Sequence, residues 1–208
     1  DSLPPAVSDL LARQAGGHPL FTQELAWALV EAGTIEVQEG RARLLIDADA
    51  LAALPLPDSL ERVITVRIDR LGPEGQLLLK VASVIGRVFN FDLLQAVAPD
   101  EGAVEQETAE LVEHDLVLPE RAPPDPAWIF KHALVRDAAY GLLVYAQRRR
   151  LHRAVAEWYE RGGEALAAHY PIVAHHYALA EVSDKARRYL ALAGAGALRS
   201  GASAEAVS

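Results

Sequence analysis

The sequence predicts a mainly α-helical protein, and three observations lead to this class. Apolar residues recur at helical spacing through most of the chain, proline and glycine stand at the ends of these segments, and stretches with strand character are short. The 208 residues are 51% hydrophobic and 24% charged, with a net charge of −9, which is ordinary for a globular protein. Disorder of the whole chain is therefore excluded.

The first part of the chain predicts two helices and a hairpin. Prolines near their beginnings and glycines at their ends predict helices at 6–15 and 19–32. Short β-prone stretches at 35–37 and 43–46, on either side of a glycine turn, predict a hairpin. Prolines at 55 and 57 then predict a stiff linker.

The next part predicts several helices followed by a two-stranded ribbon, an order typical of a winged helix. Asp58 is expected to cap the first helix together with Glu61. The loop between the two strands is rich in proline, which a central strand does not tolerate. The helices are expected at 58–71, 77–85, 91–97 and 103–114, and the strands at 116–118 and 128–130.

From Lys131 onward the pattern is helical again and indicates stacked helical hairpins of a tetratricopeptide-like repeat region. The helices are expected at 131–144, 148–160, 164–180 and 184–198. We therefore divide the chain into a helical segment (1–33), a hairpin and linker (34–57), a winged helix with a small hairpin wing (58–145) and the start of a repeat region (146–208).

Composition and motifs exclude several functions. Without cysteine the chain has no disulfide, no thiolate metal site and no thiol nucleophile, which fits a reducing compartment. Apolar runs are far shorter than the roughly 20 residues that cross a bilayer, and no leader opens the chain, so we expect a cytoplasmic protein without membrane contact. The chain starts at Asp1 and stops within an expected helix, so we expect a fragment.

Catalytic motifs are missing as well. None of the three lysines follows a glycine, so there is no phosphate-binding loop, and the common hydrolase and metalloprotease patterns are absent. We expect no catalytic residue and no enzyme activity in this chain. His169, His175 and His176 invite a metal site, but no carboxylates complete it, so we expect no metal and place His175 and His176 at a helix interface.

Two charged segments bear on nucleic acids. The helix at 103–114 would have to enter the major groove of DNA, yet residues 101–113 carry five glutamates and no lysine or arginine. We therefore expect no direct nucleic-acid binding. A basic stretch follows, and it is expected to form a solvated helix face that pairs with these glutamates. Its members are Lys131, Arg136, Arg148, Arg149, Arg150 and Arg153.

Four segments occur together in the order found in one protein family. They are GHPLFTQEL at 17–25, LPDSL through RIDRL at 56–71, VIGRVF at 84–89, and FKHAL at 130–134 with Tyr140 six residues on. In these segments the chain resembles the ATPase regions attached to bacterial class III adenylyl and guanylyl cyclases. These are STAND-type, AAA/NB-ARC-like signal-transduction ATPases, in which a nucleotide-binding domain is followed by a helical lid, a winged helix and helical repeats.

The resemblance implies a nucleotide site shared with an upstream domain. Gly17 and Pro19 match the lid motif whose proline packs against adenine, although a simple helix start is the alternative. His132 matches the histidine that reaches the β-phosphate of ADP, and a core histidine that caps its own helix is the alternative. Ala133 departs from plant resistance proteins, which have an aspartate there.

The resemblance also implies a function. The fragment is expected to be the regulatory part of a multidomain ATPase, sensing ADP or ATP bound upstream with Mg and controlling an output domain, a nucleotide cyclase. The alternative is the same module in a large ATP-dependent LuxR-type transcription regulator. The implied partners are the upstream nucleotide-binding and output domains, with a protein on the repeats, and the fragment alone is not expected to bind nucleotide tightly.

Overall fold

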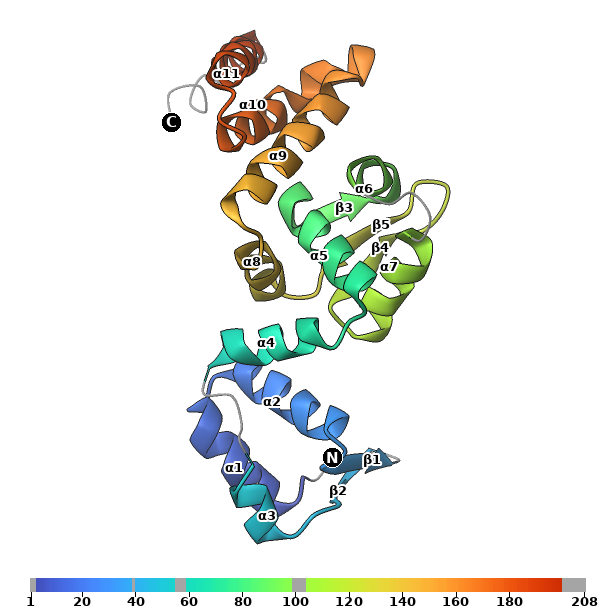
Figure 1. Cartoon of the computed structure of the whole chain (residues 1–208), viewed down its shortest axis with the longest axis vertical. Helices are drawn as coiled ribbons and strands as arrows, with labels where there is room; N and C mark the ends of the chain where they lie inside the picture. Colours follow the sequence, from blue (N-terminus) through green and yellow to red (C-terminus); the bar gives the residue numbers. More distant parts are fainter. Residues whose placement is uncertain (1–2, 39, 55–58, 99–103, 200–208) are drawn as a thin grey trace. The chain divides into compact units, whose positions relative to one another are not determined.

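A computed structural model describes residues 3–38, 40–54, 59–98 and 104–199 (Figure 1). The protein is mainly α-helical, as predicted, and it divides into two compact units, residues 1–70 and 71–208. Within the described residues, no helix has the length and apolar character needed to span a membrane.

The first unit consists of helices and a small antiparallel hairpin. α1 and α2 pack against each other, α2 packs against α4, and the antiparallel hairpin pairs Ile35 with Leu44. Buried side chains from all of the helices and from β1 form one apolar core. The elements are α1 (Pro5–Ala15), α2 (Pro19–Glu31), β1 (Ile35–Gln38), β2 (Arg41–Leu44), α3 (Ala48–Ala52) and α4 (Leu60–Asp69).

A buried ion pair joins α2 to α4 in this unit. Arg67 donates a hydrogen bond to Glu24, and their side chains are only 4% and 2% exposed. The packing of α4 thus belongs with the first unit, whereas the sequence grouped this helix with the winged helix. Ser59 caps α4 by accepting a hydrogen bond from the Arg62 amide at 3.3 Å, and the expected cap, Asp58, lies outside the described residues.

The second unit begins with three helices and a three-stranded sheet. α5 packs against α6 and α7, and the antiparallel sheet has the order β3-β5-β4, so β5 is central. Helices therefore precede the ribbon of β4 and β5, in the order that the sequence predicted. The elements are α5 (Pro73–Ile85), β3 (Val88–Asn90), α6 (Phe91–Val97), α7 (Val104–Glu113), β4 (Val117–Arg121) and β5 (Ala127–Phe130).

Two details of this sheet differ from the sequence prediction. β3 was not predicted, because three residues before a helix carry too little pattern to indicate a strand. β4 extends through Pro119 to Arg121, where a proline loop was expected. The proline is tolerated because β4 is an edge strand, and the register shifts between Pro119 and Arg121.

The rest of the second unit is helical. α8 packs against α5, and α9, α10 and α11 pack in succession, in agreement with the stacked helices predicted (Figure 1). The single helix expected at 164–180 is instead η1 followed by α10, because Pro171 fits the first turn of a helix but not its interior. The elements are α8 (Ala133–Gly141), α9 (Tyr145–Glu160), η1 (Gly163–His169), α10 (Tyr170–Leu179) and α11 (Ser183–Arg199).

One carboxylate ties the last three helices together. Glu160 at the end of α9 accepts hydrogen bonds from the hydroxyl of Tyr177, the hydroxyl of Tyr189 at 2.8 Å and the ammonium of Lys185 at 2.7 Å. Burial by itself raises the pKa of Glu160. The three hydrogen bonds lower it by more than burial raises it, so the pKa lies below the usual value.

Candidate functional site

Gly17 and Pro19 lie at the exposed turn between α1 and α2. Gly16 and Gly17 have φ angles of 56° and 81°, in the left-handed region that glycine adopts without strain, and they end α1. Pro19 then occupies the first turn of α2 and is exposed. His18 caps α2, since its Nδ1 accepts a hydrogen bond from the Phe21 amide at 3.3 Å.

His132 occupies the N-cap position of α8, as His18 does in α2, but its side chain does not cap the helix. Its backbone is extended, as at a helix N-cap, yet its side chain makes no capping hydrogen bond. Its Nε2 atom is buried and has no hydrogen-bond partner among the described residues. The alternative in which His132 caps its own helix therefore lacks the hydrogen bond that it requires.

The surroundings of His132 favour an anion. The first-turn amides of a helix have no intrahelical acceptor, and the helix dipole adds positive potential at this end. The first turn of α8 holds no acidic residue. The carboxylate of Asp115 is already occupied by an ion pair with Lys131, the residue before His132. Ala133 is exposed, so the aspartate position of the plant proteins carries no polar group here.

The sequence-predicted residues fall in separate units. Gly17 and Pro19 belong to the first unit, and His132 belongs to the second. Each position is therefore described by itself. Pro19 presents an exposed apolar ring, and His132 presents an imidazole nitrogen that has no hydrogen-bond partner in the part of the chain that the structure describes.

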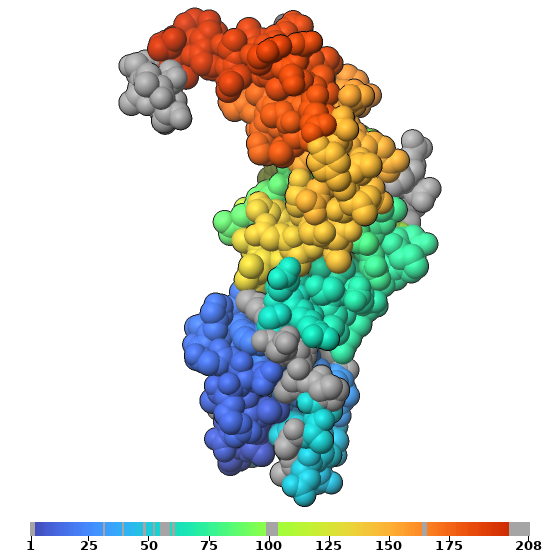
Figure 2. Space-filling view, turned by 60° about the vertical axis from the view of Figure 1, so that its left-hand side comes forward, coloured from blue at the N-terminus to red at the C-terminus, as the bar shows by residue number. Residues whose placement is uncertain are grey.

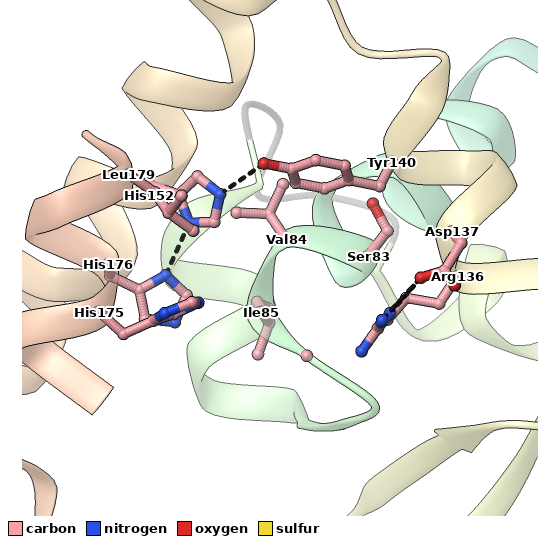
Figure 3. A pocket seen from close by; sticks show the side chains of 11 residues that line it. Ser83, Val84, Ile85, Arg136, Asp137, Tyr140, His152, His175, His176 and Leu179 are labelled. Atoms are coloured by element: carbon pink, nitrogen blue, oxygen red, sulfur yellow. Dashed lines mark hydrogen bonds and ion pairs between the residues drawn. The ribbon is translucent and has the colours of Figure 1, made fainter. Parts of the chain in front are cut away.

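A pocket of about 420 Å³ lies elsewhere in the second unit and was not predicted (Figure 3). It is bounded by the end of α5 and by side chains of α8, α9 and α10. Arg136 and Asp137 of α8 form a half-exposed ion pair at 2.6 Å on one side of it, and histidines lie on the other. The lining residues are Ser83, Val84, Ile85, Gly86, Arg136, Asp137, Tyr140, His152, His175, His176 and Leu179.

A chain of polar side chains crosses the wall of this pocket (Figure 3). The Tyr140 hydroxyl lies 3.0 Å from Nε2 of His152, and Nδ1 of His152 lies 2.8 Å from Nδ1 of His176. Both imidazoles are buried, with 3% of each residue exposed. The chain thereby links α8 to α9 and α10, and its buried hydrogen bond between the two histidines is strengthened by the low local dielectric.

Burial keeps both histidines neutral. It lowers the pKa of His152 to about 4, with smaller contributions from the charges of His175 and Arg148. Burial lowers the pKa of His176 to about 3, with contributions from His152 and His175. Two protonated imidazoles would present facing N–H groups at Nδ1, so only one ring can donate across this contact.

The histidines do not form a metal centre in the described part of the chain. No group of three or more histidine, cysteine, aspartate or glutamate side chains is placed there to hold a metal ion. His176 is buried between α9 and α10, whereas His175 is exposed and His169 packs 4.9 Å from the ring of Tyr159. The position expected for His176, at a helix interface, agrees with this arrangement.

Side chains of the basic stretch make several contacts within the second unit. Arg148 donates to the Gly141 carbonyl at 3.1 Å, and Arg149 pairs with Glu181 at 3.0 Å. Lys131 pairs with Asp115, and Arg136 pairs with Asp137. Glu110 of α7 accepts a hydrogen bond from the Gly72 amide at 3.0 Å.

No family model matches the chain. It is 28% identical over 183 residues to the uncharacterized protein R02095 of Rhizobium meliloti (strain 1021). The aligned region is 81% of this chain but 16% of that protein, so the chain spans about one-sixth of the length of this relative.

Proposed function

We propose that this chain is a regulatory segment of a multidomain signal-transduction ATPase, in which the helical lid and the winged helix sense ADP or ATP held by an upstream domain. The buried Nε2 of His132 at the start of α8, which has no hydrogen-bond partner among the described residues, carries this proposal. A buried polar atom without a partner is rare in native proteins and calls for an explanation. A phosphate oxygen of the nucleotide supplies the missing acceptor.

The energetics of this contact suit a switch. A hydrogen bond to a charged group is worth about 1.5–3 kcal/mol, and the backbone amides and dipole at the start of α8 add to it. A difference of that size between the nucleotide-bound and free states biases a two-state equilibrium by roughly tenfold or more. Loss of the phosphate contact would then release the output domain.

The other parts of the proposal follow from the same assignment. The exposed ring of Pro19, after the left-handed turn at Gly17, offers an apolar surface to the adenine. Catalytic groups and Mg belong to the upstream domain, the output is a nucleotide cyclase, and the protein works in the cytoplasm. α7 carries glutamates and no cations, so it is not used to bind DNA.

The test is the rate of ADP release from the full-length protein. His132→Ala is expected to accelerate the release of a fluorescent ADP analogue about tenfold or more and to raise basal output activity. His175→Ala is the matched control, because His175 is exposed and belongs to the same unit. An unchanged release rate in His132→Ala would refute the proposed phosphate contact.

A further inference from the structure

A basic groove lies along α9 and shares no lining residue with the histidine pocket. It has a volume of about 240 Å³ and is lined by the first half of α9 and by the residue that follows α10. Its lining combines two alanines with three arginines: Ala146, Ala180, Arg149, Arg150 and Arg153.

The groove follows from the periodicity of α9. Ala146, Arg150 and Arg153 are spaced four and three residues apart, so they share one face of the helix. The residues that face the interior, Leu151 and Val155 among them, lie on the other side. Since the inward face is already apolar, the arginine face remains open to solvent, and much of α9 reaches the surface in Figure 2.

The positive charge of this face is only partly neutralised within the chain. Arg149 is paired with Glu181 at 3.0 Å. Arg150 and Arg153 are exposed and make no ion pair with any residue that the structure describes. No acidic residue stands in the first turn of α9, and the positive end of its dipole lies here. A cationic surface thus stands out on a protein with a net charge of −9.

Apolar surface adjoins these charges. Val144 and Tyr145, at the start of α9, are 62% and 61% exposed. The Arg149 guanidinium lies 5.8 Å from the centre of the Tyr145 ring, so this apolar surface is continuous with the arginine face. An occupant that fits must therefore supply both negative charge and apolar side chains.

We propose that this groove docks an acidic, amphipathic segment of polypeptide, with carboxylates placed against Arg150 and Arg153 and apolar side chains over Ala146 and Tyr145. Charge complementarity gives such a partner its orientation and association rate, while the apolar contacts hold it. A phosphate ion or a nucleic-acid backbone satisfies only the charges and leaves the apolar surface in water. The partner is therefore a protein segment.

The experiment measures binding of a synthetic helical peptide, with glutamates on one face and leucines on the other, to the complete chain by fluorescence anisotropy. Arg150→Glu with Arg153→Glu is expected to weaken binding at least about tenfold, and raising the salt from low to moderate concentration is expected to weaken it severalfold. Circular dichroism verifies that the variants keep their helices.

The control variant is Arg187→Glu with Arg188→Glu, which changes the net charge equally on exposed residues of α11. It is expected to retain binding within about twofold, since neither arginine lines the groove. Three results would overturn the proposal: an equal loss in this control, undiminished binding of the peptide with glutamine in place of glutamate, or displacement of the peptide by inorganic phosphate or duplex DNA at moderate salt.

Discussion

The Nδ1 atoms of His152 and His176 lie 2.8 Å apart, within hydrogen-bonding distance, in a buried contact between α9 and α10. One ring must donate the proton and the other must accept it. The contact is therefore stable only while at least one of the two imidazoles is neutral, and burial ensures this by lowering the pKa of both.

The second unit should lose stability in acid for this reason. The pKa of His152 falls from 6.5 in the unfolded chain to about 4, and that of His176 to about 3. At a pH between the folded and the unfolded pKa values, the unfolded chain binds more protons than the folded chain. The contribution to stability is therefore full above about pH 7 and declines as the pH falls through 6.5 toward 4. Urea unfolding at a series of pH values measures this slope. Replacing both histidines by glutamine should flatten it, and an unaltered slope in that variant would contradict the assignment.

Tyr140→Phe should destabilise the second unit by about 1 kcal/mol, because it removes the hydroxyl that lies 3.0 Å from Nε2 of His152 and leaves that nitrogen without a partner. Tyr145→Phe is the matched control. The Tyr145 hydroxyl also donates a hydrogen bond, to Glu181, but it does so on the surface, where water replaces the lost partner. Chemical unfolding should therefore show little change in the control, and equal losses would contradict a special role for the Tyr140 contact.

Glu24→Gln should destabilise the first unit by about 3–5 kcal/mol, since it leaves the buried guanidinium of Arg67 without its carboxylate. Replacing Glu24 and Arg67 together by leucine and methionine should recover most of that loss, because no buried charge then remains. Thermal unfolding of both variants provides the measurement. The exposed pair of Arg187 and Asp184 serves as the reference, and its disruption should have an effect of less than about 1 kcal/mol.

The two histidines at helix starts should respond in opposite ways to substitution. His18→Ala should cost about 0.5–2 kcal/mol of stability, because it removes the hydrogen bond from the Phe21 amide that caps α2. His132→Leu should cost nothing or raise stability, because it replaces by apolar atoms a buried nitrogen for which the described residues supply no partner. Denaturant titration compares the two. A loss in His132→Leu as large as that in His18→Ala would indicate a structural role for His132.

Much of the fold could be predicted from local sequence chemistry. The helix beginning at Pro19 and the end of α1 at Gly16 follow from residues whose backbone preferences act within one turn. The placement of α4 could not be predicted in this way, because the pairing of Glu24 with Arg67 joins residues 43 positions apart. Nothing in the local pattern of either helix indicates that contact.

The candidate sites divide in the same manner. His132 was found through the segment around it, but the state of its Nε2 depends on packing that only the structure provides. The chain from Tyr140 through His152 to His176 was not predicted, because its three members come from three different helices. The sequence offered only a weak signal that His152 is buried. His152 lies one residue from Leu151 and four residues from Ala156, on the inward face of α9.

Pro119 limits how the three-stranded sheet can pair with strands of other chains. β4 is an edge strand, and a proline within it lacks the amide that a further strand would need as a donor. The opposite edge, β3, is only three residues long. The three-stranded sheet is thereby protected at both margins against recruiting strands from other chains.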